Sequence, residues 1–475
     1  MTHSRRDFLV RTTCAALGAA AFQGTVRQFG LANLLATPKN ITGNYRALVC
    51  VFLAGGNDGN NMVIPSDSGY AAYSAARGAD LSIAQGSLLA INNPPSMGGR
   101  TFGFHPNLPE LQALFNSGHM AIVCNVGPLV YPMTQADYMN NSVPKPFSLF
   151  SHSDQVQCWQ TSRADIKVGT GWGGRTSDAT LSCNPSNGYP TITSIAGQAT
   201  FCVGLQQRPL AIGTGNLNTV LVLNGFTSSP EDVARLTSMD YLRTVDLTAD
   251  LIAATSQATQ QAVNISAMMV DQTLSTVFPN TSIGNQLKQV AKVIKLNQAS
   301  LNLERQIFFV SQGGYDTHQN QIPDQGGNFS DLSAALGAFY NATVELGLQD
   351  DVATFTLSDF SRTLQASGSG GCAGSDHGWG NHQFVIGGGS VLGGNFYGTP
   401  GSNGTVFPTL QLGGPDDTST SGRGRWIPTS SVEEYGATVA KWFGVAGADM
   451  ATVFPLIGNF PSSDLGFMGA PPAGC

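Results

Sequence analysis

Four short apolar runs along the chain have the pattern of strands that are buried on both faces of a sheet. They span residues 46–54, 120–126, 307–311 and 352–357. Runs of this length, bounded by glycine or aspartate, are typical of parallel strands that are covered by helices on both sides. A helical pattern over residues 108–115 precedes the second run, so we expect a helix followed by a strand there.

Polar residues mark further helices around the last two runs. Ser330 or Asp331 is expected to cap a helix that ends near Leu346. Ser431 and Glu434 form the capping-box pattern that begins another helix. This alternation of strands and helices predicts an α/β fold with a doubly wound, mainly parallel sheet and helices on both faces.

The middle of the chain interrupts the alternation. Residues 183–305 begin as short apolar pieces among Gly, Pro and Asn and then take on a helical pattern. We therefore expect a single α/β domain over residues 37–475, with an irregular and helical insertion at about 183–305.

The first segment has the pattern of an export signal. Arg5 and Arg6 are followed by Phe8-Leu9 and by a modest apolar stretch, which resembles a twin-arginine signal peptide over residues 1–36. The alternative is an ordinary amphipathic first helix with two surface arginines. The signal predicts passage through the twin-arginine translocase to the periplasm or the cell exterior. No later apolar run is long enough to anchor the mature chain in a membrane.

Composition and charge exclude several classes of protein. Of the 475 residues, 41% are hydrophobic and 11% are charged, which is too apolar for a disordered chain and too sparsely charged for a coiled coil. The net charge is −7, and no basic run follows the signal, so nucleic acid is not expected as a partner.

The cysteines allow disulfide bonds without predicting their pairing. Export makes disulfides possible, and four cysteines lie in loop-like surroundings: Cys183, Cys202, Cys372 and Cys475. Cys50 and Cys124 lie within apolar runs and are expected to be buried thiols.

Three of the four apolar runs are followed closely by an aspartate, namely Asp58, Asp316 and Asp359. The carboxyl ends of strands in an open α/β sheet face one crevice, so these carboxylates are expected to converge. Carboxylates held close together repel one another unless a cation lies between them. The sequence therefore predicts a divalent metal ion at this edge of the sheet.

Histidines in polar loops support the metal prediction. His318 follows Asp316 by two residues, and Asp376, His377 and His382 lie together in a glycine-rich segment. Each histidine alone is more simply explained as a hydrogen-bonded core or surface residue. As a set with the aspartates, they suit zinc, manganese or iron better than calcium or magnesium. We expect one or two ions of zinc or manganese.

A hydroxyl at a helix start is the candidate nucleophile. Residues 150–155 read Phe-Ser-His-Ser-Asp-Gln and can open a helix, which places Ser151 and His152 at its N-terminus. A hydroxyl there suits nucleophilic attack or an anion contact beside a metal. The alternative is that Ser151 only caps the helix.

A family resemblance emerges from these motifs taken in order. The chain resembles the exported bacterial family known as domain of unknown function 1501, in the alkaline phosphatase-like superfamily that also holds the sulfatases. The motifs that carry the resemblance are Gly-Gly-Asn-Asp-Gly at 55–59, Phe-His-Pro-Asn-Leu at 104–108, Phe-Ser-His-Ser-Asp-Gln at 150–155 with Trp159, Gly-Trp-Gly-Gly-Arg at 171–175, Gly-Tyr-Asp-Thr-His-Gln-Asn-Gln at 314–321, Leu-Ser-Asp-Phe-Ser-Arg-Thr at 357–363 and Asp-His-Gly-Trp-Gly-Asn-His at 376–382. The resemblance implies a doubly wound sheet and a two-metal site.

The resemblance assigns roles to several of the candidates. Asp58 matches the aspartate after the first strand, Asp316 with His318 resembles the aspartate–histidine pair of one metal, and Asp359 and His377 resemble later ligands. Two features depart from the superfamily pattern. The spacing between Asp316 and His318 is short, and Phe360 stands where a histidine ligand is expected. The second metal position is then either rebuilt with His152 or His382, or absent.

The predicted function is metal-assisted hydrolysis of a phosphate or sulfate ester in a small molecule or polysaccharide. The catalytic candidates are Ser151, His152 and Arg362; Arg362 either offsets developing negative charge or supports Asp359. One alternative is a secreted surface or matrix protein that keeps the fold and the metal without turnover. Another is a metal-dependent redox or polysaccharide-modifying enzyme.

Overall fold

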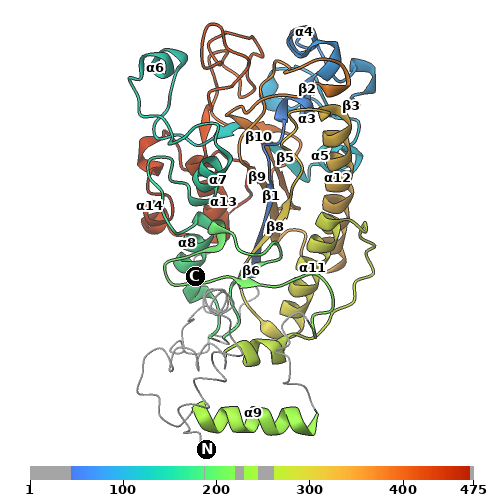
Figure 1. Cartoon of the computed structure of the whole chain (residues 1–475), viewed down its shortest axis with the longest axis vertical. Helices are drawn as coiled ribbons and strands as arrows, with labels where there is room; N and C mark the ends of the chain where they lie inside the picture. Colours follow the sequence, from blue (N-terminus) through green and yellow to red (C-terminus); the bar gives the residue numbers. More distant parts are fainter. Residues whose placement is uncertain (1–43, 187, 220–228, 244–260, 471–475) are drawn as a thin grey trace, which may run out of the picture.

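The computed structural model describes residues 44–186, 188–219, 229–243 and 261–470, built around one large sheet (Figure 1). Nine strands of the described chain form this sheet, in the order β11-β5-β10-β9-β1-β8-β6-β7, with β12 beside β5. Its strands are β1 (Arg46–Leu53), β5 (Met120–Gly127), β6 (Ile192–Ser194), β7 (Leu210–Ala211), β8 (Arg305–Gln312), β9 (Val352–Ser358), β10 (Asn381–Ile386), β11 (Phe396–Tyr397) and β12 (Ser430–Ser431).

The centre of the sheet is parallel. Strand β1 pairs in parallel with β8 on one side and β9 on the other, and Leu53 at its end lies opposite Gln312 and Ser358. The loops that follow these three strands therefore leave the sheet at the same edge. Strand β10 runs antiparallel between β9 and β5, so the sheet is mixed but mostly parallel.

Helices cover both faces of the sheet. The described helices are α3 (Gly59–Met62), α4 (Tyr70–Leu81), α5 (Pro109–Asn116), α6 (Gln135–Asn140), α7 (His152–Thr161), α8 (Trp172–Ala179), α9 (Pro230–Arg243), α11 (Ser282–Leu296), α12 (Gln321–Glu345), α13 (Val432–Phe443) and α14 (Met450–Val453). In Figure 1, α5, α11 and α12 lie on one side of the central strands, and α7, α8 and α13 lie on the other.

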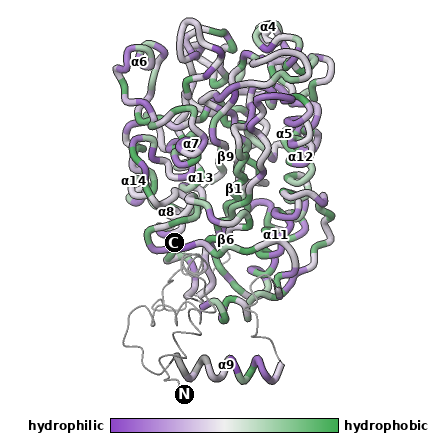
Figure 2. The backbone as a smooth tube through the Cα atoms, viewed as in Figure 1, coloured by the Kyte–Doolittle hydropathy of each residue, from purple (hydrophilic) through white to green (hydrophobic). Residues whose placement is uncertain are grey.

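The side chains of β1 point alternately to the two faces of the sheet and so contribute to the two core layers between the sheet and its helices. Val49 and Val51 belong to the core cluster that includes α11 and α12, whereas Leu48 and Cys50 belong to the cluster that includes α13. Successive strand residues point to opposite faces, so a run without polar residues buries both. Figure 2 shows these central strands as the apolar interior. The structure confirms the predicted α/β fold.

The segment 183–305 contributes to this core. Strand β6 pairs in parallel with β8, β7 extends the sheet beyond β6, and α11 packs against α12. The part of this segment that the structure describes therefore includes components of the central layers. A separate three-stranded sheet, in the order β2-β4-β3, is formed by β2 (Val63–Pro65), β3 (Leu89–Ala90) and β4 (Phe102–Phe104).

One helix begins earlier than the sequence predicted. Helix α12 starts at Gln321, well before the expected cap at Ser330 or Asp331, because its first turn tolerates Pro323 and its later glycines stay helical. The capping box of Ser431 and Glu434 is present as predicted.

The remaining predictions concern the cysteines and the ends of the chain. Cys50 and Cys124 are buried free thiols as expected, but Cys202 is also a buried free thiol, and Cys372 is an exposed one. Cys475 and the signal segment 1–36 lie outside the described residues. Within the described chain, none of the helices is both long and apolar enough to cross a membrane.

Candidate metal centre

The predicted site residues gather where the parallel strands end. Asp316 and His318 lie in the loop after β8, and Asp359 directly follows β9. His377 lies in the loop that leads into β10, and His152 is the first residue of α7. Four segments that are distant in sequence therefore meet at one edge of the sheet.

The core of the site is the triad His152, Asp316 and His377. One ligand-type atom from each residue lies within 4.8 Å of the others. Nε2 of His152 and Nε2 of His377 each lie 3.4 Å from Oδ1 of Asp316. His318 adds a third imidazole, with its Nε2 3.1 Å from the same oxygen and 2.9 Å from Nε2 of His377.

Hydrogen bonds behind the triad orient two of its rings. Nδ1 of His152 lies 2.7 Å from Oδ2 of Asp359, and Nδ1 of His377 lies 2.7 Å from the carbonyl oxygen of Phe150. A carbonyl oxygen and a carboxylate only accept, so each Nδ1 carries the proton that it donates. When these rings are neutral, their unprotonated Nε2 atoms turn toward Asp316.

This donor set fits a divalent cation. Nε2 of His152 is buried and makes no hydrogen bond within the described chain, although it faces a carboxylate oxygen and a second imidazole. Imidazole nitrogens and a carboxylate, with the outer ring nitrogen of each histidine fixed by an oxygen, are the ligands and supports that zinc and similar ions take. The residues present could therefore hold one ion between His152, Asp316 and His377, with His318 beside it.

The pKa shifts show how the site distributes charge. The pKa of His152 is raised, first by its hydrogen bond to Asp359 and then by the nearby acids. The pKa of His377 is lowered, first by burial and then by the cationic groups around it. Burial raises the pKa of Asp316, but the hydrogen bond and charge of Arg362 outweigh it, so the carboxylate stays ionised.

Arg362 supports Asp316 from inside the protein. Its side chain is fully buried, and Nη1 lies 2.7 Å from Oδ1 of Asp316 and 3.3 Å from the carbonyl oxygen of Gly55. The structure thus pairs Arg362 with Asp316 and not with Asp359. The remaining oxygen of Asp359 accepts a hydrogen bond from the amide of Gly55, at 3.0 Å.

Phe360 forms an apolar wall behind the two oriented histidines. Its ring stacks on His377 with centroids 4.5 Å apart, and it contacts the ring of His152 at 4.8 Å. Phe360, which stands where the resemblance implied a histidine ligand, is therefore buried against the imidazoles. Asp316, by contrast, has 48% of its side chain exposed, so the triad opens to solvent on that side.

Asp376 lies at the margin of this cluster. Its carboxylate pairs with Arg423, and Oδ1 lies 3.5 Å from Nδ1 of His318. Arg423 comes from the loop before β12, which the sequence interpretation did not single out. Asp376 therefore borders the candidate metal centre through His318.

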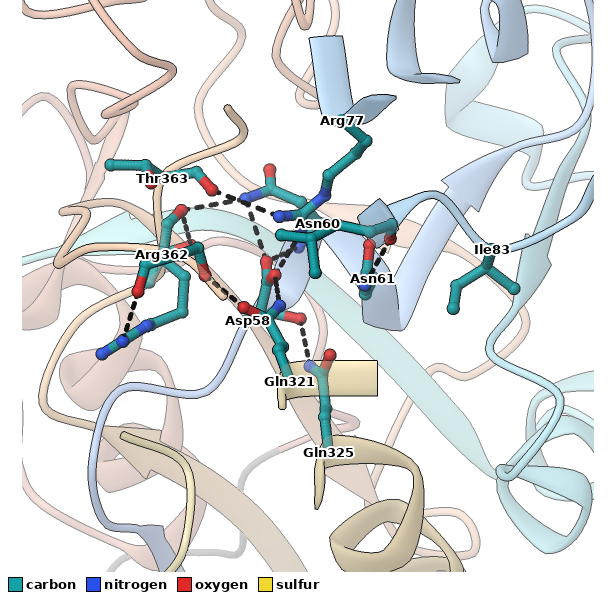
Figure 3. Close-up of polar contacts among 12 residues, drawn as sticks. Asp58, Asn60, Asn61, Arg77, Ile83, Gln321, Gln325, Arg362 and Thr363 are labelled. Carbon is teal, nitrogen blue, oxygen red and sulfur yellow. Dashed lines mark hydrogen bonds and ion pairs between the residues drawn. The ribbon is translucent and has the colours of Figure 1, made fainter. Parts of the chain in front are cut away.

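Asp58 lies apart from the triad, in a buried polar network (Figure 3). Its carboxylate forms an ion pair with Arg77 of α4, and both side chains are fully buried. It also accepts from the amide of Asn60 at 3.0 Å and from the side chain of Gln321. The positive partner that the sequence interpretation expected beside Asp58 is thus a guanidinium group.

His382 also lies outside the triad. It is buried in β10, its ring stacks on Phe407 with centroids 4.8 Å apart, and its Nδ1 accepts from the amide of Asn125 at 3.3 Å. Burial lowers its pKa to about 3, so it is a neutral core residue. The structure does not bring it to the predicted second metal position.

Ser151 occupies the N-cap of α7, directly before His152, but its side chain makes no capping hydrogen bond. Its Oγ lies 3.4 Å from Oγ of Ser153. The preceding Phe150 has a φ of 71°, which is uncommon for a bulky residue and directs its carbonyl to His377. Phe150 belongs to a motif that the sequence singled out, but its role was not predictable from the side chain because its contribution is a backbone oxygen.

Comparisons with known proteins give a family match and distant structural likenesses. The family described as "Protein of unknown function (DUF1501)" matches residues 45–407. No curated protein matches the chain.

Among solved structures, the chain is similar to an alkaline phosphatase superfamily protein from Vibrio parahaemolyticus, with 11% identity over 78% of this chain and 68% of that chain, at a TM-score of 0.30. It is similar to the sulfatase PsFucS1 from Pseudoalteromonas sp., with 10% identity over 74% and 64% of the two chains and a TM-score of 0.29. The zinc complex of the C-terminal periplasmic domain of EcEptC from Escherichia coli gives 11% identity, 75% and 76% coverage and a TM-score of 0.29. Likenesses at these scores do not identify corresponding residues.

Proposed function

The chain belongs to the DUF1501 family, and we propose that it is an exported, metal-dependent hydrolase that acts on a phosphate or sulfate ester. The observation that carries the proposal is the triad of His152, Asp316 and His377, whose ligand atoms lie within 4.8 Å of one another at the open edge of the sheet. A partly exposed group of metal ligands is suited to a substrate, whereas a structural metal site is closed.

The metal ligands of the proposed site are Nε2 of His152, Oδ1 of Asp316 and Nε2 of His377, with Nε2 of His318 next to them. A divalent ion held there would polarise the ester oxygens and offset the charge that develops on them. Zinc or manganese suits the mixture of imidazole and carboxylate. We propose one ion, because Asp58 is paired with Arg77 and His382 is buried elsewhere.

The other residues prepare the ligands. Asp359 and the Phe150 carbonyl fix two imidazole rings, and Arg362 fixes the Asp316 carboxylate and keeps it ionised. Phe360 excludes water from the inner side of the rings. Rigid support of this kind keeps the ligand geometry constant while substrate enters from the exposed side.

Ser151 is the nucleophile in this proposal. It stands directly before the ligand His152, at the N-terminus of a helix, where the helix dipole favours a developing anion. Its hydroxyl makes no capping hydrogen bond to the helix backbone; its side-chain contacts are with Ser153 and Asp154 in the first turn of α7. A Ser151→Ala variant that binds metal but has lost turnover supports this role, whereas full turnover would assign the attack to a water molecule.

Export completes the proposal. The twin-arginine pattern at Arg5 and Arg6 supports delivery to the periplasm or cell exterior. Phosphate or sulfate esters of small molecules or of polysaccharides are accessible in either place. The localisation can be measured by fractionating cells that produce the full chain and its variant with both arginines replaced by lysine.

The proposal is tested by hydrolysis of 4-nitrophenyl phosphate and 4-nitrophenyl sulfate, with and without added zinc or manganese. We expect turnover of one ester that needs the metal and that is lost in His377→Ala. His119→Ala is the matched control, since His119 stacks on Tyr340, away from the triad. A protein that binds the metal but hydrolyses neither ester nor any other ester in a wider screen would favour the non-catalytic alternative.

A further inference from the structure

Two arginines from one loop stand at the rim of the metal centre. Arg423 reaches Asp376, and Nε of Arg425 donates to the carbonyl oxygen of His377 at 2.9 Å. His377 is one of the three residues of the triad, so Arg425 is joined to the centre through a single residue.

The loop that carries these arginines is fixed by a buried carboxylate. Asp417 is fully buried and accepts from the amides of Gly413 at 3.0 Å, Gly424 at 2.8 Å and Arg425 at 3.1 Å. The amide of Leu364 also donates to the carbonyl of Gly424, at 3.1 Å. The backbone that presents the arginines is therefore held in place before any substrate binds.

The two guanidinium groups differ in how many of their nitrogen atoms donate hydrogen bonds within the protein. Arg423 bonds to Asp376, Gln365, Ser367 and the carbonyl of Ala366, so each of its nitrogens has a partner. Arg425 uses only Nε, and its guanidinium carbon lies 4.5 Å from the ring centroid of Phe150. Within the described chain, its two terminal amino groups have no partner, and the side chain is half-buried.

An arginine in this state is prepared to bind an anion. Its position is fixed by a hydrogen bond and by packing on an aromatic ring, and its planar edge with two N–H donors remains free. Such an edge matches two oxygens of a sulfate, phosphate or carboxylate group. The guanidinium of Arg425 packs on the ring of Phe150, and the carbonyl of the same residue orients His377. Phe150 therefore positions both this arginine and one residue of the triad.

We propose that Arg425 determines specificity by binding a second anionic group of the substrate, next to the group held at the metal centre. This inference rests on the proposed function for the identity of the group at the metal. It narrows the substrate class to esters whose alcohol part itself carries a sulfate, phosphate or carboxylate. A polyanionic saccharide ester has this chemistry.

The test compares ligands that lack an ester bond and so cannot be hydrolysed. Propylphosphonate offers one anionic group, and alkane diphosphonates with three to five carbons offer two at different spacings. Binding of each is measured by titration calorimetry to the zinc-loaded protein. We expect the best diphosphonate to bind wild type roughly tenfold more tightly than propylphosphonate, because charge-assisted hydrogen bonds contribute at this level.

The variants separate this role from a structural one. Arg425→Ala is expected to lose the advantage of the diphosphonate and to keep its affinity for propylphosphonate. Arg100→Ala is the matched control, because Arg100 also lies over a phenylalanine ring, at 5.2 Å, but its guanidinium is occupied by Asp67. The proposal is overturned if Arg425→Ala keeps the advantage or weakens both ligands equally. If wild type binds propylphosphonate equally well with and without zinc, the proposed metal centre is contradicted, and this result is distinct from a failure of the Arg425 proposal.

Discussion

The imidazole of His152 and the carboxylate of Asp359 are held together at 2.7 Å, between the start of α7 and the end of β9. The contact uses Nδ1 of the histidine and leaves Nε2 toward Asp316. Asp359, whose side chain is only 4% exposed, therefore supports a candidate ligand from inside the protein. Its place at the end of a parallel strand brings a carboxylate to the site without placing it among the ligand atoms of the triad.

Asp359→Asn is expected to weaken metal binding without removing it. The amide keeps the shape of the carboxylate but loses the charge that makes His152 a stronger ligand. Loss of such a supporting carboxylate costs roughly 10- to 100-fold in metal affinity. Competition with a chromophoric zinc chelator measures the change, and Asp464→Asn, at an ion pair with Lys441 on the surface, is the control. An unchanged affinity in Asp359→Asn would show that the contact has no part in metal binding.

Asp58→Asn is expected to destabilise the fold and to leave the metal content unchanged. The substitution leaves the guanidinium of Arg77 buried without its charged partner, which costs about 3–5 kcal/mol in the free energy of unfolding. Urea denaturation measures this cost, and elemental analysis of the folded protein measures the metal.

The double variant Asp58→Asn with Arg77→Met controls for the unpaired charge. It removes both charges and is expected to recover part of the lost stability. A folded Asp58→Asn protein that has lost metal would instead make Asp58 a ligand, as the sequence interpretation proposed.

Glu433 is expected to make stability fall as the pH rises. It is buried in the first turn of α13, and burial raises its pKa from 4.5 to about 8. Between these two values the folded state keeps a proton that the unfolded state has released, so the free energy of unfolding decreases with increasing pH. Glu433→Gln removes this dependence.

Urea denaturation of wild type and Glu433→Gln across this range measures the effect of Glu433. The stability of wild type relative to the variant should fall between about pH 5 and pH 8 and then level off. Glu231→Gln, at an exposed position of α9, should follow wild type. Parallel pH profiles for wild type and Glu433→Gln would show that Glu433 does not retain its proton.

The central strands were predictable because burial on both faces leaves a continuous apolar run. This holds for β1, β5, β8 and β9, whose observed bounds differ from the predicted ones by three residues or fewer. Strands β6 and β7 were not predictable, because they have only three and two residues and pair with strands distant in sequence or with each other: β6 with β8, and β7 with β6. The antiparallel direction of β10 likewise depends on neighbours that are distant in sequence.

The positions of site residues were predictable where polar residues follow strands. They were not predictable where tertiary packing determines the surroundings of a side chain. Asp316 and His318 lie in the loop after β8 and His377 in the loop before β10, at the same edge of the sheet. His382 lies two residues before Phe384 in the same strand, so both point to one face and into the core. Asp58 forms a buried ion pair with Arg77. The position of Arg77 depends on the packing of α4, so no local sequence pattern predicts this ion pair.

The metal content of the purified protein tests the central claim most directly. Wild type, purified without chelators and offered zinc or manganese, is expected to hold one ion per chain by elemental analysis. His152→Ala is expected to remain folded and to lose the ion, while His119→Ala keeps it. A folded wild-type protein that takes up neither metal, or a His152→Ala variant that retains the full amount, would contradict the account.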